Sequence, residues 1–171
     1  MVPTLSQIEA YTTDHLIDGA DHWDCLADRW EDAHWQVRNQ AHVLDWQGAA
    51  ADALRERTIS EYTVASSQAE QLRSTSRIAR QQAGELDQLR NRVLYAVEDA
   101  HDAGFIVGED FSVTDTRTSR TAAELAARQA QAQVFAADIR SRAAALVGAD
   151  TSVAGDLSGA AAGIGDTNFE I

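Results

Sequence analysis

The stretch at residues 43–54, "VLDWQGAAADAL", separates two long segments in which apolar residues recur at helical spacing. A large aromatic, a polar residue and a glycine stand at the break, namely Trp46, Gln47 and Gly48. Glycine readily adopts the left-handed backbone conformations that turn a chain between helices. The stretch therefore predicts a short turn, and two long helices joined by a short link pack as an antiparallel hairpin.

The segment before the turn predicts one helix that begins at residues 4–7 and continues to the turn. Two overlapping pairs near its start have capping-box spacing, Ser6 with Glu9 and Thr4 with Gln7, and the sequence leaves both open. Apolar residues then follow spacings of three, four and seven, which predicts one buried face. The members of this face are Leu16, Trp23, Leu26, Trp30, Ala33, Val37 and Leu44.

The segment after the turn predicts a second helix from just after Gly48 to Gly104. Its apolar face follows the three-four alternation that is typical of coiled-coil packing. The members of this face are Leu54, Tyr62, Ala65, Ala69, Leu72, Ala79, Ala83, Leu86, Val93, Val97 and Ala100. Ser76 and Arg90 interrupt it, so the packing should be looser there. The predicted hairpin therefore covers residues 4–103.

A shorter region follows the hairpin. Residues 105–113, "FIVGEDFSV", alternate briefly around Gly108, which predicts a small β-hairpin or an ordered loop. A third helix should cover about residues 117–147, with Gly148 as its natural end. Its apolar stripe is expected at Leu125, Ala132, Ile139 and Leu146, with Phe135 beside it.

The last segment, residues 148–171, holds five of the ten glycines and has no helical period, which predicts a flexible tail or linker. Hydrophobic residues make up 44% of the chain, which is enough for one core, and the single proline favours helix. The sequence therefore predicts an all-α helical bundle, with a helical domain at residues 1–147 and a tail at 148–171.

The charge balance argues against nucleic acid as a partner. The chain has 27 acidic residues and 14 arginines, which give a formal net charge of −13. Such a surface repels a phosphate backbone unless one face is locally basic. The best basic cluster is Arg73, Arg77 and Arg80, which is small and has no aromatic residues among its members. We therefore expect no nucleic-acid binding.

No apolar run approaches the roughly 20 residues that span a bilayer, so no membrane span is expected. The N-terminal residues lack the basic and apolar regions of a Sec signal peptide, so export would need another route. Cys25 is the only cysteine, which excludes an intrachain disulfide.

Four residues that can bind metals recur on the first predicted helix at i, i+3, i+7 and i+10. They are His15, Asp18, His22 and Cys25. One helical face could present all four. Ligands spread over three turns of one helix span roughly 15 Å, however, and cannot converge on one ion without a partner chain. We therefore expect no metal site and interpret the four residues as part of a solvated acidic face.

The same helix is crowded with acidic residues, at Asp14, Asp18, Asp21, Asp24, Asp28, Glu31 and Asp32. Paired carboxylates perform acid–base chemistry in a water-poor cleft, which this pattern does not predict. The chain has no nucleophile elbow, no phosphate-binding glycine loop and no zinc-hydrolase histidine pair. We therefore predict a non-enzymatic protein without a cofactor, whose acidic face is solvated or serves as an electrostatic docking surface.

The four tryptophans differ in position. Trp23 and Trp30 belong to the predicted apolar face and are expected in the core. Trp35 lies off that face and should pack on the third helix or on a partner. Trp46 stands at the tip of the hairpin, where a bundle has little core to bury it.

Two motifs in this order resemble a known family. A helix, the turn Trp46-Gln47-Gly48 and a second helix resemble the WxG, or ESAT-type, superfamily of helical-hairpin proteins that type VII (ESX) secretion systems export. The second helix closes with "YAVED", in which Tyr95 and Asp99 match the Y-x-x-x-[DE] secretion motif of such substrates. The resemblance implies a secretion substrate or targeting domain, with a composite export signal at Trp46, Gly48, Tyr95 and Asp99.

The resemblance also implies a location and partners. The protein would be made in the cytoplasm and secreted, or displayed at the cell surface, without a cleavable signal peptide. Its partners would be an ESX secretion ATPase or chaperone, and a small WxG-family protein or a second copy. Small family members stop after the hairpin, whereas this chain continues. It is therefore more similar to the N-terminal targeting domain of a larger actinobacterial or mycobacterial effector, or to PE/PPE- and Esp-type substrates.

The two motifs are far apart in a straight hairpin. Tyr95 lies 49 residues beyond Trp46, which corresponds to roughly 70 Å at about 1.5 Å per helical residue. They can form one recognition surface only if a second hairpin lies antiparallel against the first, so we expect an antiparallel dimer. The alternative is a helical scaffold or partner-binding bundle unrelated to secretion, in which the two motifs are coincidental.

The predicted apolar face of the second helix can be tested by truncation. Replacing Leu72 or Leu86 by alanine should lower the free energy of unfolding by about 2–5 kcal/mol, because a buried leucine leaves a cavity. Urea denaturation followed by circular dichroism measures the loss. A loss below about 1 kcal/mol at both positions would place them outside the core.

Overall fold

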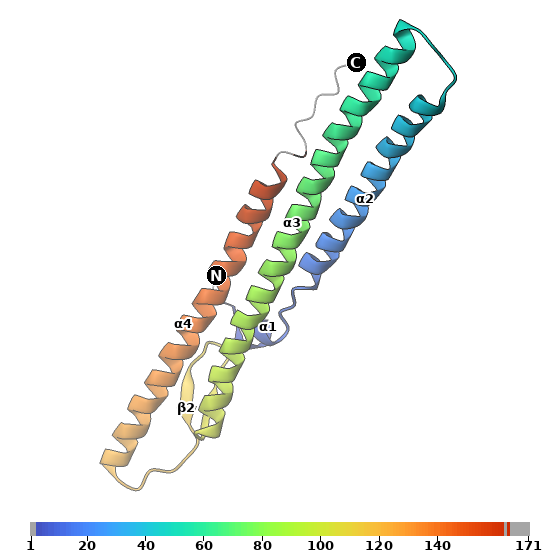
Figure 1. Ribbon diagram of the computed structural model, residues 1–171. Coiled ribbons are helices and arrows are strands. Elements are labelled where there is room, and N and C mark those ends of the chain that lie inside the picture. Colours follow the sequence, from blue (N-terminus) through green and yellow to red (C-terminus); the bar gives the residue numbers. More distant parts are fainter. Residues whose placement is uncertain (1–2, 163, 165–171) are drawn as a thin grey trace. The chain divides into compact units, whose positions relative to one another are not determined.

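The computed structural model describes residues 3–162 and residue 164. In this part of the chain it has four helices and two short strands (Figure 1). They are α1 (Leu5–Glu9), α2 (Asp14–Val43), α3 (Ala49–Asp102), β1 (Phe105–Val107), β2 (Val113–Asp115) and α4 (Ala122–Ala161). The prediction of a mainly α-helical fold with a small β-hairpin is confirmed.

The chain forms two compact units. The first unit comprises Met1–Thr13 and Gln82–Val153, and the second comprises Asp14–Gln81 and Ala154–Ile171. Both α3 and α4 contribute residues to both units. Each unit is described by its own contacts.

The capping box at the start of α1 uses one of the two predicted pairs. The Thr4 hydroxyl accepts a hydrogen bond from the Gln7 amide at 3.3 Å, and the Gln7 side chain accepts one from the Thr4 amide at 2.9 Å. The competing pair, Ser6 with Glu9, is not used. Glu109 instead accepts hydrogen bonds from the Ser6 amide at 3.1 Å and from the Ser6 hydroxyl at 2.5 Å.

The helix expected to continue unbroken to the turn is two helices, with residues 10–13 between them. The Arg90 guanidinium donates to the last two carbonyls of α1 at 3.0 and 2.5 Å. The Thr13 side chain is buried, and its hydroxyl donates to Asp87 at 3.1 Å. Contacts with distant residues of the first unit therefore end α1, and the local sequence pattern could not predict them.

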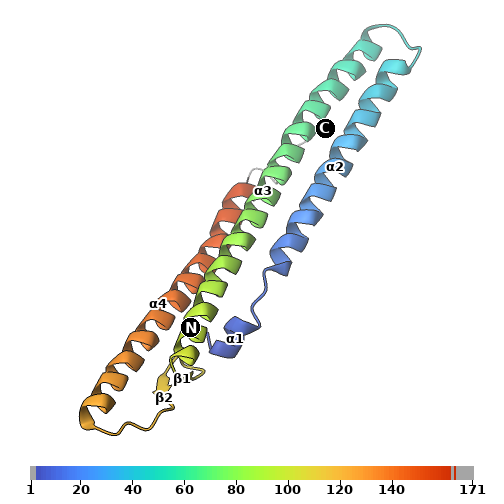
Figure 2. The same ribbon diagram turned by 60° about the horizontal axis from the view of Figure 1, so that its bottom comes forward.

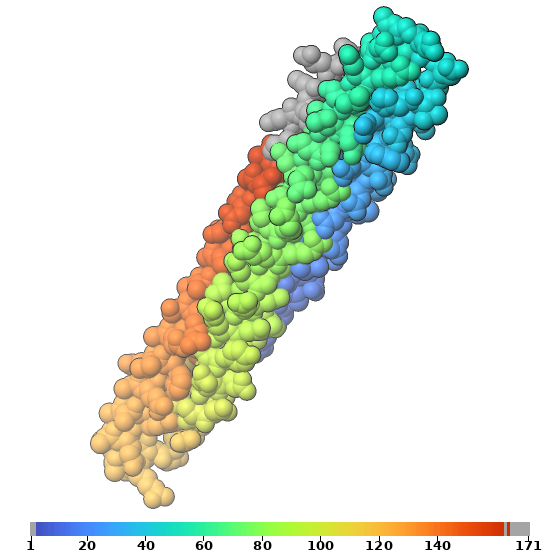
Figure 3. Space-filling view, viewed as in Figure 1, coloured from blue at the N-terminus to red at the C-terminus, as the bar shows by residue number. Residues whose placement is uncertain are grey.

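The first unit encloses the largest buried side chains. α4 lies along the second half of α3 in the ribbon and in the space-filling view (Figure 1, Figure 3). The large, fully buried apolar residues of this unit are Phe105, Phe111, Ile8, Leu86, Ile139 and Val93. The predicted burial of Leu86 is confirmed, whereas Leu125 of the predicted stripe is 48% exposed in the first turn of α4.

The β-hairpin follows directly on α3 (Figure 2). Gly104, with φ of +83°, reverses the chain after the helix. The strands pair antiparallel, with Phe105 opposite Asp115 and Val107 opposite Val113. The side chains of Phe105 and Val107 are buried and the residue between them is exposed, so one face of the hairpin completes the core.

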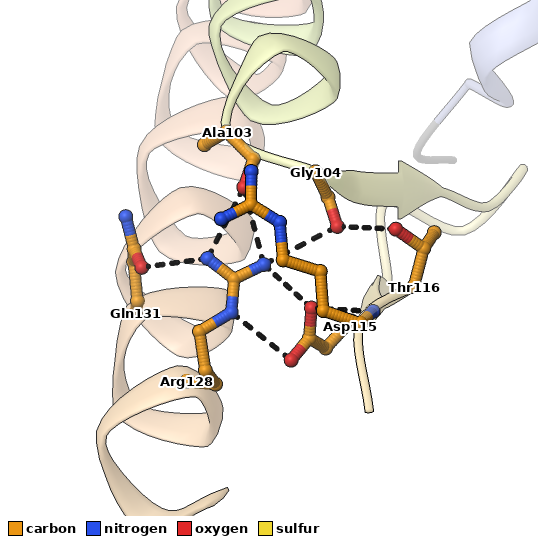
Figure 4. A network of polar contacts seen from close by, with 7 residues as sticks. Ala103, Gly104, Asp115, Thr116, Arg128 and Gln131 are labelled. Atoms are coloured by element: carbon orange, nitrogen blue, oxygen red, sulfur yellow. Dashed lines mark hydrogen bonds and ion pairs between the residues drawn. The ribbon is translucent and has the colours of Figure 1, made fainter. Parts of the chain in front are cut away.

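One arginine of α4 ties this hairpin to the end of α3 (Figure 4). Arg128 donates to the Asp115 carboxylate at 3.0 and 2.5 Å, and to the carbonyls of Ala103 and Gly104 at 3.1 and 3.2 Å. Its guanidinium also lies 3.7 Å from the centroid of the Phe105 ring. The hydrogen bonds from Arg128 lower the pKa of Asp115 to about 2.

The second unit is packed through small residues. The buried alanines of α2 and of the first part of α3 are Ala20, Ala27, Ala41, Ala51, Ala65, Ala69 and Ala79. The larger buried aliphatic residues in the described part of this unit are Leu16 and Leu72. Its largest fully buried side chains are Thr75 and Ser76, both polar. The predicted burial of Leu72 is confirmed. Few large apolar side chains are buried between α2 and α3 in this unit, however.

The predicted end of the third helix at Gly148 is wrong, because α4 continues to Ala161. The Tyr11 hydroxyl donates to Asp150 at 2.6 Å, and Val153 is buried. A glycine within a helix costs about 1 kcal/mol relative to alanine, and tertiary contacts of this kind offset that cost. The predicted flexible tail is therefore helical over its first part. The tail residues at 163 and 165–171 lie outside the described residues.

Replacing Asp115 by asparagine should lower the thermal unfolding midpoint at pH 7, because the variant lacks the charged partner of Arg128. The pKa of Asp115 in the folded protein is about 2, below its ordinary value of 3.8. The ion pair therefore stabilises the fold fully above about pH 4, and this contribution is lost as the pH falls toward 2. Thermal unfolding of both proteins by circular dichroism at pH 7, 4, 3 and 2 measures the difference.

The matched control is Asp138→Asn, which removes an exposed ion pair with Arg142 within α4. Exposed pairs of this kind contribute little, so the midpoint should change by less than about 2 °C. A difference between wild type and Asp115→Asn that stayed constant down to pH 2 would contradict the role of the Asp115 charge.

Candidate functional site

The chain turns between α2 and α3 at residues 44–48, as predicted. The Trp46 amide donates to the Leu44 carbonyl at 2.8 Å, and the Gly48 carbonyl accepts from two amides in the first turn of α3. Gly48 has a φ of +105°, which residues with a side chain rarely adopt. Apart from the glycine and its two chain neighbours, no heavy atom of the described residues lies within 4 Å of the place where its Cβ would stand. Backbone conformation, rather than crowding, therefore explains the glycine of the W-x-G motif.

Large apolar side chains are exposed around this turn. The exposed fractions are 48% for Trp46, 54% for Leu44 and 84% for Val43. Val37 and Leu54, on the adjoining helical turns, are also exposed. Single exposed apolar residues are ordinary, but a group of them around one turn is typical of an interaction surface.

The prediction of the buried face of α2 is wrong for part of its residues. Ala33, Val37 and Leu44 were expected in the core and are exposed. The buried positions in this helix include the small residues Ala27 and Ala41. Ala27 packs in one cluster with Ala69 and Leu72 of α3. The larger apolar residues therefore lie beside the contact between the helices and not within it.

Tyr95 and Asp99 lie on the exposed side of α3, near its C-terminal end. The Tyr95 side chain is 62% exposed and Asp99 is exposed. They are four residues apart and therefore share a face of the helix. Val93 and Val97 are buried on the opposite side. The structure accordingly presents both side chains to solvent, where another protein can reach them.

The two motifs belong to different units of the chain. Trp46 lies in the second unit, before the first residue of α3, and Tyr95 lies in the first unit, seven residues before the last residue of α3. The expected export-signal residues therefore form one exposed site in each unit, at Trp46 and Gly48 in the second and at Tyr95 and Asp99 in the first.

A residue that the sequence analysis missed contacts the turn. Arg55, in the second turn of α3, donates to the Trp46 carbonyl at 2.8 Å and to the Leu44 carbonyl at 3.4 Å. Its other nitrogen donates to Asp52 at 3.1 Å. The sequence offered one signal for this residue, namely an acidic residue three positions before an arginine, close to a predicted turn. That spacing alone indicates a helical ion pair and gives no sign of the contacts to the turn.

The other tryptophans have different surroundings. Trp23 packs against the buried cluster of Ala27, Ala69 and Leu72. Trp30 is partly buried and stacks on His34, with the ring centroids 6.2 Å apart. Trp35 is 50% exposed in the single chain, and its expected packing on the third helix or on a partner stays a prediction. Trp35 and Trp46 are similarly exposed, at 50% and 48%.

All three members of the predicted basic cluster pair with acidic residues. Arg73 pairs with Asp28 and Glu31 of α2 at 2.8 Å, and Arg80 pairs with Asp21 at 2.6 Å and Asp24 at 2.8 Å, also of α2. Arg77 pairs with Glu70 of its own helix at 3.1 Å. Hydrogen bonds from Ser66 and Arg73 hold the pKa of Glu31 below its usual range. Part of the predicted solvated acidic face therefore binds α3. The arginines that could have contacted phosphate are already paired.

The four residues considered as metal ligands are exposed along α2. They are His15, Asp18, His22 and Cys25. In the part of the chain that the structure describes, no three histidine, cysteine or acidic side chains lie close enough to hold one ion. Across the same residues, no helix combines the length and the apolarity that a bilayer crossing requires.

The first unit has an apolar groove of about 750 Å³ between the N-terminal segment and α4. Its lining includes Pro3, Phe111, Ala144 and Val147, with Glu109 and Arg140 among the charged residues. Glu109 already binds Ser6. This lining provides packing surface and not the nucleophile with an adjacent base that covalent catalysis uses.

Three mycobacterial proteins are similar to this chain. They are the uncharacterized proteins Rv2077c and MT2137 of Mycobacterium tuberculosis and Mb2102c of Mycobacterium bovis. Each is 53% identical over 169 residues, which is 99% of this chain and 52% of the relative. The chain therefore spans about half the length of the curated relatives it matches. No family model matches the chain. No solved structure matches it either.

Proposed function

We propose that this chain is a non-enzymatic type VII secretion substrate or secretion-targeting domain of the WxG superfamily. The observation that carries the proposal is the exposed Trp46 in a turn between two long helices, with Gly48 in a conformation that requires glycine. The backbone conformation of the turn accounts for Gly48 alone, whereas the motif also accounts for the exposed tryptophan two residues before it. The second motif adds support, because Tyr95 and Asp99 face solvent.

The mycobacterial origin of the similar proteins supports the same proposal, since the resemblance points to that lineage. Their greater length supports the idea that this chain is one module of a longer exported protein. In this proposal the protein is made in the cytoplasm and leaves it without a cleavable signal peptide. An ESX secretion ATPase or chaperone recognises it.

A partner is part of the proposal. The second unit buries alanine where its helices meet and leaves Trp46, Leu44 and Val37 exposed. Complete burial of such a side chain contributes about 1.5–3 kcal/mol by transfer free energy, and roughly half of this is still available at these half-exposed positions, so a partner helix would gain from docking here. The partner is a small WxG-family protein or a second copy of the chain. Antiparallel pairing would place the Tyr95 of one molecule near the Trp46 of the other.

The alternative is a helical scaffold or partner-binding bundle unrelated to secretion. The same exposed apolar residues around the turn favour it, because they would serve any helical partner equally well. The two proposals differ in whether export depends on Trp46 and Tyr95.

Export of single variants from a mycobacterial host separates these proposals. Trp46→Ala and Tyr95→Ala should each reduce the secreted fraction at least about fivefold, because each lacks an exposed recognition group. The thermal midpoint should stay within about 3 °C of wild type, because both side chains contribute little to the core. The secreted fraction is measured by immunoblot of culture filtrate against cell lysate, with a strain lacking the ESX ATPase as background.

The matched control for Trp46→Ala is Trp35→Ala, which truncates an equally exposed tryptophan of the same unit. At the second site, Asp99→Asn should also reduce the secreted fraction, and its matched control is Glu98→Gln, which neutralises the neighbouring exposed carboxylate. Both controls should be exported as wild type. Unchanged export of Trp46→Ala and Tyr95→Ala would reject the secretion proposal and leave the scaffold alternative.

The expected antiparallel self-association has its own measurement. Sedimentation equilibrium from about 1 to 200 μM should show a concentration-dependent dimer, which Trp46→Ala weakens by at least about tenfold in dissociation constant. A small WxG partner would instead give a monomer that forms a mixed dimer when that protein is added. A monomer at every concentration that is still exported on its own would exclude pairing as part of the export signal.

A further inference from the structure

The placement of Arg55 is unusual for a basic residue. It lies in the second turn of α3, beside the turn at residues 44–48. Its side chain is only 25% exposed. An arginine without a specific partner would extend into solvent at such a position. The contacts of Arg55 therefore have to offset the lost solvation.

These contacts close the C-terminal end of α2. The last carbonyls of a helix have no partner within the helix, and they carry the negative end of its dipole. One terminal nitrogen of Arg55 donates to the carbonyls of Leu44 and Trp46, directly after this end. The other donates to Asp52 on its own helix. Arg55 thus connects the residues before Gly48 to the first turn of α3 after it, through hydrogen bonds to both.

The contact with the Trp46 carbonyl restrains the backbone that carries the tryptophan. Gly48 allows the chain to turn, but glycine also has the greatest backbone freedom, so it does not hold the turn in one conformation. The bond from the Trp46 amide to the Leu44 carbonyl spans only three residues. The Arg55 guanidinium donates to the carbonyls of both Leu44 and Trp46, so it restrains the backbone from which the Trp46 side chain projects.

We propose that Arg55 is a positioning residue of the W-x-G site: it holds the turn so that the exposed Trp46 is presented in one orientation for recognition. This inference rests on the proposed function of Trp46. A recognition residue held in one orientation before binding loses less conformational entropy when it binds. Arginine suits this role because its planar group carries several donors in a fixed arrangement, whereas lysine offers one ammonium group.

The first test measures the turn itself in the purified full chain. In Arg55→Gln, the amides of Trp46 and Ala51 should exchange with deuterium about tenfold faster than in wild type, because charge-assisted hydrogen bonds are lost. Amides in the Arg128 region should be unchanged. The control is Arg77→Gln, which removes the same charge from α3 at a position where the arginine pairs with Glu70. Exchange at the turn equal to wild type in Arg55→Gln would overturn the proposal.

The second test measures export in the same host. Arg55→Gln should reduce the secreted fraction to about the level of Trp46→Ala, and Arg55→Lys should give an intermediate value. Arg77→Gln should be exported as wild type. A purely structural role of Arg55 would lower the thermal midpoint and leave the export of the folded protein intact, so both are measured for each variant.

The outcomes separate this inference from the proposed function. Normal export of Arg55→Gln together with failed export of Trp46→Ala would overturn the positioning role and leave the proposed function intact. Normal export of Trp46→Ala would overturn both. Loss of export in Arg55→Gln and Trp46→Ala, with faster exchange at the turn and a midpoint within about 3 °C of wild type, supports the positioning role.

Discussion

Arginines from later in the chain close the C-terminal ends of the first three helices. Arg90 donates to the last carbonyls of α1, Arg55 to the carbonyls that follow α2, and Arg128 to those that follow α3. Helix C-termini carry carbonyls without partners and the negative end of the dipole, so a guanidinium satisfies both needs at once. Two of these arginines also contact the segment that follows the helix: Arg55 donates to the W-x-G turn at the Trp46 carbonyl, and Arg128 donates to Asp115 of the β-hairpin.

The two units differ in what lies between their helices. In the first unit, α3 and α4 enclose Phe105, Phe111 and Ile139, so this unit has a core of ordinary apolar side chains. In the second unit, alanines bring α2 close to α3, and arginine–carboxylate pairs border the contact. Exposed ion pairs contribute little to stability. The unit that carries Trp46 is therefore the one with less apolar burial of its own, and a helical partner would compensate for that deficit.

Local patterns predicted the features that depend on nearby residues. The turn at Gly48, the long second helix with Leu72 and Leu86 on its buried side, and the small hairpin all follow from spacing and from glycine. The start of the third helix was predicted too early, at about residue 117, whereas α4 begins at Ala122. The signal for the correct start was visible in the sequence, because Thr121 and Glu124 form a capping box with the usual spacing. The buried face of α2 was harder to predict from the sequence. Its pattern favours the large apolar residues, whereas its contact with α3 is made by alanines.

Other features depended on residues far apart in the chain. The break at residues 10–13 depends on Arg90 and Asp87, and the continuation of α4 past Gly148 is accompanied by the contact between Tyr11 and Asp150. Neither partner can be identified from local spacing, because hydrogen bonds between distant residues have no sequence period. The position of Arg55 was visible, but its role in holding Trp46 was not.

The sequence by itself determined that the protein is mainly helical, that the chain turns at Trp46-Gln47-Gly48, and that the turn needs glycine. Periodicity and backbone conformation are local properties, and they are encoded within a few residues. The tertiary structure decided where α1 and α4 end, which acids pair with which arginines, and that Trp46 and Tyr95 are both exposed. Burial and pairing depend on which segments meet, and that is settled only when the whole chain has packed.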